Sequence, residues 1–312
     1  MGGLRRMRRV QPRGKALMSC TVIPNYRIFT DATADFAPGT LADLPRISVI
    51  PMEVAFDGRT YLCGAKGNLP VGRFYAMQRE GGLASTSQIN PHVYLAAFEE
   101  ALQSGYDVLY LGFSSGMSGT LETARLCMEA LRQRYPGRKL ICVDTLCASV
   151  GEGLLVCGAV RRQYAGMPVD ALAEWVVQNR LKVCHWFTVD GFEHLRRGGR
   201  IGAASAAVGG MLNIKPLLRV DDGGKLQVMK KPRGRKKAVA ELIACMKRTW
   251  APDISPFIAV GHSDNYDAAL MLADAVARQF PQADPHMADI GPVIGAHTGP
   301  SMLALAYWGK NR

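Results

Sequence analysis

The sequence lacks several features that would each have assigned a class. No window holds the roughly 20 consecutive apolar residues that a membrane-spanning helix needs, so no integral membrane association is expected. The eight cysteines include no C-x-x-C pair and no Cys/His cluster with zinc spacing, which argues against a disulfide framework and a zinc module. Scattered cysteines are typical of small core residues in a reducing compartment, so a cytoplasmic location is expected.

Positive charge is unevenly distributed along the chain. The formal net charge is +12, and residues 1–17 alone hold six basic side chains and no acidic one. We expect residues 1–24 to form a basic, disordered tail, because no apolar core of a signal peptide follows the charged segment. Residues 196–237 hold twelve basic and two acidic side chains but no aromatic residue, so base stacking is unsupported and no nucleic-acid partner is expected. A nucleic-acid or regulatory role for that segment is kept as an alternative, with steeply salt-dependent binding as its signature.

Two domains are expected from the length of 312 residues and from a change in pattern near Met167. Residues 25–167 alternate strand-like runs with helical stretches, which predicts an α/β domain with a parallel sheet. Residues 168–312 contain the turn signal Asp221–Gly224 between two strand-like runs, which predicts an α+β domain. We also expect one long strand over 47–56, a hydroxyl-rich loop over 85–88 and a strand-like run ahead of His297.

The segment Ser114–Thr120 is the most informative part of the sequence. An apolar strand-like run precedes it and a helical stretch follows it, so four hydroxyls and two glycines lie at a strand-to-helix turn. Ligands of α/β proteins bind at such turns, where glycines allow close approach and unpaired N–H groups at the start of the helix attract an anion. The segment therefore predicts a site for an anionic group.

The same turn supports a competing hypothesis. Gly112–Gly116 matches G-x-S-x-G, the nucleophile elbow of α/β-hydrolases, and Asp264 and His297 follow in the chain order of that class. A serine hydrolase would use Ser114 as nucleophile, His297 as base and Asp264 to orient the base. No loop resembling the usual oxyanion-hole glycines precedes the turn, so the hydrolase is the alternative hypothesis.

Seven segments, in order along the chain, combine hydroxyl, glycine and basic residues in short motifs. They are Thr30–Asp35, Thr86–Gln88 with Pro91, Ser114–Thr120, Asp144–Ser149, Leu195–Ile201, Arg233–Lys237 and His297–Pro300. Together they resemble motifs of the DegV family, the fatty-acid-binding proteins that serve bacterial fatty acid kinase. The resemblance covers residues 26–308, which is nearly all of the chain outside the basic tail. Ala32 departs from the pattern, since the family motif T-D-S-T-A-D carries a serine there.

This resemblance implies an N-terminal domain with a parallel sheet, a C-terminal domain with a mixed sheet, and a long-chain fatty acid between or within them. It implies that hydroxyls at the positions of Thr86 and Ser115 hold the fatty-acid carboxylate. The wider set expected around the carboxylate adds Ser87, Ser114, Ser118, His297 and Thr298. The residues expected to engage the phosphate and the kinase are Arg200, Arg233 and Arg235.

The resemblance further implies a carrier with no catalytic residue of its own, whose bound acid is phosphorylated by a separate fatty acid kinase. The carrier then holds the acyl phosphate and contacts acyltransfer machinery transiently on the way to phospholipid synthesis. No cofactor and no metal is expected, and the fatty acid is the ligand. Burial of its chain favours binding by about 0.8 kcal/mol per CH₂. Candidate lining residues are Leu154, Leu155, Val156, Met211 and Leu212.

Overall fold

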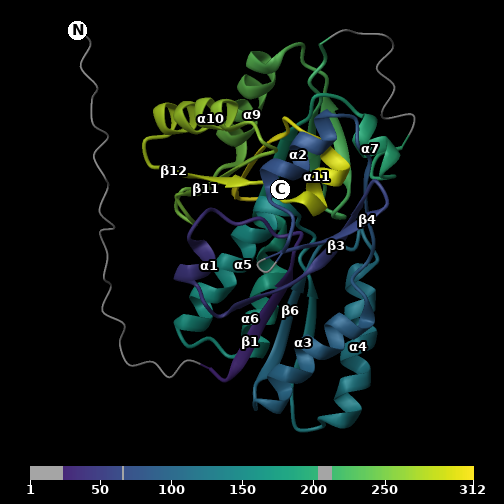
Figure 1. The fold of residues 1–312 in the computed structure, drawn as a ribbon. Helices are drawn as coiled ribbons and strands as arrows, with labels where there is room; N and C mark the ends of the chain where they lie inside the picture. Colours follow the sequence, from purple (N-terminus) through teal and green to yellow (C-terminus); the bar gives the residue numbers. More distant parts are fainter. Residues whose placement is uncertain (1–23, 65–66, 203–212) are drawn as a thin grey trace, which may run out of the picture.

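The computed structural model of this chain describes residues 24–64, 67–202 and 213–312. Three β-sheets form the framework of the described part (Figure 1). A parallel sheet lies in the lower half of Figure 1 and a mixed sheet in the upper half. The expected α/β fold, with a parallel N-terminal and a mixed C-terminal sheet, is therefore confirmed. The expected basic tail falls almost entirely on residues 1–23, outside the described residues.

The N-terminal sheet contains four parallel strands in the order β2-β1-β6-β7. These strands are β1 (Tyr26–Asp31), β2 (Ile47–Ile50), β6 (Asp107–Gly112) and β7 (Leu140–Asp144). Their side chains alternate between the two faces of the sheet, as the pleat of a strand requires. Phe29 and Tyr110 pack in one core, whereas Ile28 and Leu109 pack in another on the opposite face.

Helices cover both faces of this sheet, as nearly continuous apolar strands require. They are α3 (Pro91–Gln103) and α4 (Thr120–Arg134) on one face and α5 (Ser149–Tyr164) and α6 (Val169–Asn179) on the other. The start of α3 is typical of helix N-termini, because the Asn90 side chain accepts the His92 N–H and Pro91 occupies the first turn. The α5 helix is almost wholly buried, because it lies between the two large sheets.

A small antiparallel sheet, in the order β4-β3-β5, corrects two expectations. Its strands are β3 (Met52–Phe56), β4 (Arg59–Cys63) and β5 (Ala84–Thr86), and α1 (Thr40–Asp43) and α2 (Val71–Arg79) lie nearby in the chain. The single strand expected over 47–56 is wrong, because Pro51 lacks the N–H needed to continue a ladder and the chain changes sheet there. The loop expected over 85–88 is wrong in its first half, which belongs to β5.

The C-terminal sheet has six strands in the order β10-β9-β8-β13-β11-β12. They are β8 (Val183–Thr188), β9 (Leu217–Val220), β10 (Leu226–Lys230), β11 (Phe257–His262), β12 (Asp284–Asp289) and β13 (Leu303–Trp308). The shorter connecting elements are the 3₁₀ turn η1 (Arg180–Lys182) and α7 (Glu193–Arg197). One face packs against α9 (Arg235–Thr249) and α10 (Tyr266–Gln279), and the other faces the N-terminal domain. The turn Asp221–Gly224 joins β9 to β10 as a hairpin, as expected.

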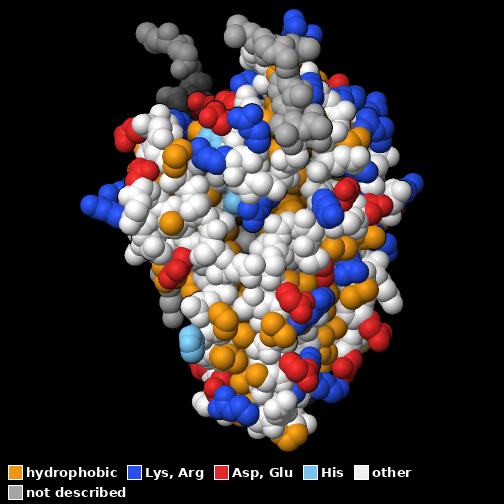
Figure 2. Space-filling model, turned by 90° about the vertical axis from the view of Figure 1, so that its right-hand side faces the viewer, with side chains coloured by type: hydrophobic (Ala, Val, Ile, Leu, Met, Phe, Trp, Pro, Cys, Tyr) orange, Lys and Arg blue, Asp and Glu red, His pale blue; other side chains and the backbone are white. Residues whose placement is uncertain are grey.

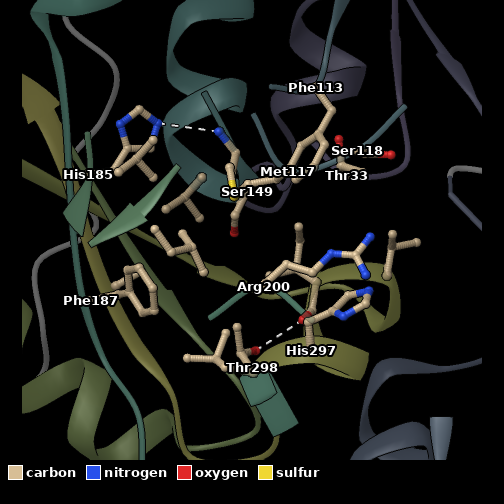
Figure 3. Close-up of a pocket in the computed structure, with 18 of the residues that line it drawn as sticks. Thr33, Phe113, Met117, Ser118, Ser149, His185, Phe187, Arg200, His297 and Thr298 are labelled. Carbon is tan, nitrogen blue, oxygen red and sulfur yellow. Dashed lines mark hydrogen bonds between the residues drawn. The ribbon is translucent and has the colours of Figure 1, made fainter. Parts of the chain in front are cut away.

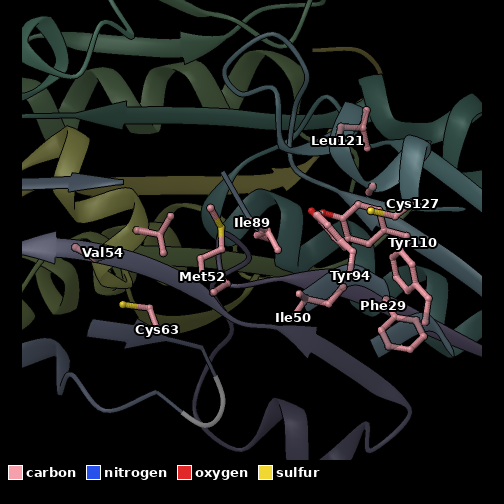
Figure 4. Packing of buried hydrophobic residues seen from close by; sticks show 14 of the residues in the cluster. Phe29, Ile50, Met52, Val54, Cys63, Ile89, Tyr94, Tyr110, Leu121 and Cys127 are labelled. Carbon is pink, nitrogen blue, oxygen red and sulfur yellow. The ribbon is translucent and has the colours of Figure 1, made fainter. Parts of the chain in front are cut away.

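Helix α11 (Pro292–Thr298) connects the two halves of the molecule. The strand-like run expected before His297 is wrong, because Pro292 opens this helix and its preset backbone angle suits a first helical turn. Val293 and Ala296 pack into the N-terminal core with Phe74, although they come late in the chain. Figure 4 shows part of that core. The domain boundary at residue 167 stays a prediction, since the packing crosses it.

Candidate ligand-binding site

A cavity of about 290 Å³ lies between the mixed sheet and the carboxyl ends of the parallel strands, which is where α/β folds place ligands. The segments that follow β1, β6 and β7 supply Thr33, Met117 and Ser149, and β8 and β13 supply Phe187 and Ala304 from the other side. Figure 3 shows these walls facing one another. Most of the lining is apolar, so the cavity suits a ligand that is largely apolar.

One end of the cavity is polar. Six of the ten predicted site residues line the cavity: Thr86, Ser87, Ser118, Arg200, His297 and Thr298. They come from β5 and the residue after it, the turn before α4, the segment after α7, and the end of α11. The structure thus brings together residues more than 200 positions apart in the sequence.

Thr86 and His297 form a hydrogen-bonded pair, with 2.8 Å between Oγ1 and Nε2. His297 Nδ1 is buried without a hydrogen-bond partner among the described residues. Gly198 lies against this nitrogen so closely that a Cβ there would be 2.2 Å from Nδ1. A threonine hydroxyl and a neutral imidazole carry one proton each and use only one between them. Since Gly198 covers Nδ1, the donor that a ligand can reach is the Thr86 hydroxyl, which is free to donate when the ring donates its own proton from Nε2 to Thr86 Oγ1.

The polar end is positive. Burial and, to a lesser extent, the nearby Arg200 and Arg197 charges together lower the pKa of His297 to about 4, so the ring is neutral at pH 7. Arg200 is half-buried and donates to the Gly198 carbonyl, and it forms no ion pair with a described carboxylate. No Asp or Glu is among the described residues that line the cavity. A permanent cation with no internal counter-ion, beside a spare donor, suits an anionic group.

Ser114 and Ser115 take positions that sequence reasoning did not foresee, since neither lines the cavity. Ser114 is fully buried and donates to the Gly224 carbonyl, 2.7 Å away, on the β9–β10 turn. Ser115 donates to the Asp144 carboxylate at the end of β7. Both hydroxyls are thus engaged by the protein itself.

These contacts overturn the hydrolase hypothesis. The Ser114 hydroxyl is bonded to a backbone carbonyl, and the described partner of His297 is Thr86. Asp264, the proposed orienting residue, pairs instead with Arg79 on α2. No hydrogen bond links the three proposed triad members among the described contacts. The G-x-S-x-G match is therefore a coincidence of sequence.

Arg233 and Arg235 lie outside the cavity. Arg233 is exposed and its backbone pairs with Ile214. Arg235 is partly buried, where it pairs with Asp190 and donates to the Ser301 carbonyl, 2.8 Å away. Arg235, the first residue of α9, therefore links two segments: Asp190 lies just after β8, and Ser301 lies just before β13. Lys and Arg side chains are more frequent over the upper, C-terminal half of the face shown in Figure 2.

Several lining residues were missed. Thr33, Ser149 and His185 line the cavity, and Ala304 and Ala306 form part of its floor. The alternation of Leu and Ala in the run LALA of β13 is a signal that could have revealed the floor, because every second position is small. The three expected lining residues Leu154, Leu155 and Val156 belong instead to the core between α5 and the parallel sheet. Met211 and Leu212 lie outside the described residues.

The described residues contain neither a cluster of metal-ligating side chains nor a helix that could span a membrane. No group of three or more His, Cys, Asp or Glu side chains there could hold a metal ion. None of the described helices is long and apolar enough to cross a membrane.

The fold and the site define a class of protein: two α/β units that enclose an apolar cavity with one positive end, which suits an amphipathic anion. The chain belongs to the DegV family, because the model of that family, described as "Uncharacterised protein, DegV family", matches residues 25–310. A DegV domain-containing protein of Clostridium perfringens is 38% identical over 287 residues, which cover 92% of this chain and 98% of the relative.

Solved structures share the fold. A structure described as fatty acid binding of a DegV family protein from Thermus thermophilus has a TM-score of 0.79 and 29% identity, covering 91% of this chain and 99% of that one. The Fatty Acid Kinase (Fak) B3 protein of Streptococcus pneumoniae, loaded with linoleic acid, has a TM-score of 0.78 over 91% of this chain and 99% of its own. At 20% identity, that second likeness supports the fold alone.

Proposed function

We propose that this protein binds a long-chain fatty acid, with its carboxylate at the polar end and its acyl chain along the apolar wall. The observation that carries the proposal is the cavity, whose lining includes the cation of Arg200 and the spare donor of the Thr86–His297 pair but no described carboxylate. The fatty acid binding described for the Thermus thermophilus relative supports it. Ser87 and Ser118 complete the carboxylate site beside Thr298, whose hydroxyl donates to the Ile294 carbonyl, while Ser114 and Ser115 support the turn that carries Ser118.

We further propose that the bound acid is the substrate of a separate fatty acid kinase and that this protein has no catalytic step of its own. The kinase partner follows from the resemblance to the DegV family motifs, and the Fatty Acid Kinase (Fak) B3 protein of Streptococcus pneumoniae shares the fold of this chain. A carboxylate held by neutral donors and one arginine keeps its nucleophilic oxygen, and the exposed Arg197 and Arg233 offer a positive surface to the kinase and the new phosphate. Transient contact with acyltransfer enzymes of phospholipid synthesis and a cytoplasmic location, where ATP is available, complete this proposal.

The test has two parts. Mass spectrometry of denatured protein purified from a bacterial host should reveal a long-chain fatty acid, and its absence would contradict ligand binding. Purified bacterial fatty acid kinase and ATP should then phosphorylate the bound acid. Arg233→Ala should slow that reaction without loss of the acid, because a charge at the rim of an interface mainly governs association. Arg278→Ala, which removes an exposed arginine on α10, is the matched control. Equal rates for both variants would remove Arg233 from the kinase surface.

A further inference from the structure

Strand β13 forms the floor of the cavity. Met302, Ala304 and Ala306 line the cavity, whereas Leu303 and Tyr307 belong to the core beneath α9 and α10. Each residue of a strand advances about 3.4 Å, so successive floor positions are about 7 Å apart. Met302 follows His297 and Thr298 closely in the chain and lies near the polar end. Ala304 and Ala306 therefore lie at successively greater distances from the polar end.

The floor ends after Ala306. The next residue on the same face is Trp308, which does not line the cavity. Its ring lies 5.8 Å from the ring of Trp175 on α6, and a Cβ at Gly158 on α5 would be 3.2 Å from it. Beyond Ala306, the space between the mixed sheet and α5 is thus filled by protein.

His185 stands beside Ala306 at this closed end. The two residues are direct partners in the ladder between β8 and β13, and both line the cavity. Figure 3 shows His185 and His297 on opposite sides of the cavity. The cavity thus extends from a polar end at His297 to an end closed by His185.

The ring of His185 is fixed in place. Its Nε2 accepts the Ala148 N–H at 3.4 Å, so the proton lies on Nδ1, which donates to the Val183 carbonyl at 2.9 Å. A Cβ at Gly151 would lie 2.1 Å from Nε2, so α5 reaches the ring only because this position has no side chain. Burial and the Arg312 charge lower the pKa of His185 well below its ordinary value, which keeps the ring neutral. Because both ring nitrogens are hydrogen-bonded, the imidazole ring is held in one orientation where it lines the cavity.

We propose that His185, together with Ala306, sets the longest acyl chain that the cavity accepts, with the terminal methyl group against the imidazole ring. This inference rests on the proposed binding of a fatty acid. The residues act by volume: a smaller side chain at position 185 lengthens the cavity, and a larger one at position 306 shortens it.

The test is a competition among ligands. Delipidated wild-type protein, His185→Ala and Ala306→Leu are each loaded with an equimolar mixture of the saturated acids from lauric to arachidic, and the retained acids are identified by mass spectrometry. His185→Ala should shift retention toward longer acids and Ala306→Leu toward shorter ones. Each methylene that no longer fits should lower relative retention about fourfold, the equivalent of about 0.8 kcal/mol. His286→Ala, whose ring stacks on Phe257 outside the cavity, is the control and should retain the wild-type profile.

The outcomes separate the two proposals. Wild-type protein that retains no acid at all would overturn the proposed function. Wild-type protein that binds acids, with variants of unchanged profile and native circular dichroism, would overturn the role of His185 and Ala306 alone. If His185→Ala does not fold, Ala306→Leu still decides, because an unshortened profile in that variant contradicts the closed end.

Discussion

At the scale of single residues, His297 reports directly on where an anion binds. Its pKa of about 4 reflects burial and two neighbouring arginines, both of which disfavour the charged ring. A fatty-acid carboxylate beside the ring would offset those charges. We therefore expect NMR titration of the His297 ring to give a pKa near 4 without ligand and a higher pKa with a bound fatty acid. Identical values in the two states would place the carboxylate elsewhere.

The same shift makes folding depend on pH. The unfolded chain binds a proton at this histidine near pH 6.5, whereas the folded chain binds it near pH 4. The contribution of His297 to the free energy of unfolding is thus fully present above pH 6.5 and is lost as the pH falls toward 4. A bound anion raises the folded-state pKa of His297. It therefore narrows the pH range over which this stability is lost, because the lower limit of that range moves up from 4.

A second residue-scale feature is a hydroxyl shared by two buried carboxyl groups. Thr33 Oγ1 lies 2.6 Å from Asp31 Oδ1 and 2.8 Å from Glu152 Oε2, and a hydroxyl has only one proton to donate. Burial raises the pKa of Asp31, but the hydrogen bonds that it accepts from the Thr33 hydroxyl, the Tyr110 hydroxyl and the Thr33 N–H favour its charged form and offset part of that rise. Burial and the Asp31 charge raise the pKa of Glu152 well above its ordinary value. Glu152 therefore carries a proton and donates it to Thr33.

This assignment predicts unequal effects of two isosteric changes. Glu152→Gln should leave the free energy of unfolding within about 1 kcal/mol of wild type, because an amide N–H₂ replaces the carboxyl proton as donor. Asp31→Asn should cost about 1–3 kcal/mol, because an amide replaces an acceptor that serves several donors. Urea denaturation at pH 7 measures both. A larger loss in Glu152→Gln than in Asp31→Asn would reverse the assignment.

At the scale of elements, the turn at Ser114 and the β9–β10 hairpin form one contact between the parallel sheet and the mixed sheet. A Cβ at Gly224, where φ is +72°, would lie 2.0 Å from Ser114 Oγ. A Cβ at Gly116 would lie 2.5 Å from the Gly223 carbonyl oxygen. Glycine at these positions lets two backbones touch, and the Ser114 hydroxyl bonds across the contact.

Ser114→Ala should loosen this contact. The natural control is Thr145→Val, because Thr145 donates to the Gly112 carbonyl at the same 2.7 Å and is equally buried, but its bond stays at the parallel sheet. Each change should cost about 1 kcal/mol of stability. Hydrogen exchange followed by mass spectrometry should show faster exchange at residues 221–225 in Ser114→Ala only. Equal exchange there in both variants would mean that the hydroxyl does not hold the hairpin.

The sequence predicted which helices and strands form better than it predicted how side chains point and which strands pair. Thr86, Ser118, Arg200 and His297 could be grouped because each stands in a segment that resembles a motif of the DegV family. The orientation of Ser114 could not be predicted, because it depends on a carbonyl 110 positions away. The change of sheet at Pro51 was missed for a related reason: periodicity shows that a strand forms but not which strands it pairs with.

At the scale of the whole molecule, residues of both large sheets and of the segments that follow their strands line the cavity, so a ligand in it binds only the assembled form. Delipidated protein should therefore melt at a lower temperature than protein loaded with fatty acid. At a free ligand concentration of 100 times Kd, the stabilisation is about 2.7 kcal/mol. Calorimetry should show one transition that moves as a whole. A ligand-dependent shift in only one of two separate transitions would contradict a shared site.

The late position of α11 in the chain has a consequence for synthesis. Val293 and Ala296 complete a core whose other members come almost entirely from residues 29–140, so a ribosome must make most of the protein before that core can close. Bacterial ribosomes add about 5–20 residues per second, and domains with all their parts fold as they emerge. In this protein, the apolar surface around Phe74 stays partly exposed until α11 has been synthesised. We therefore expect the nascent chain to expose part of this apolar core until α11 has emerged, which is the condition under which chaperones bind.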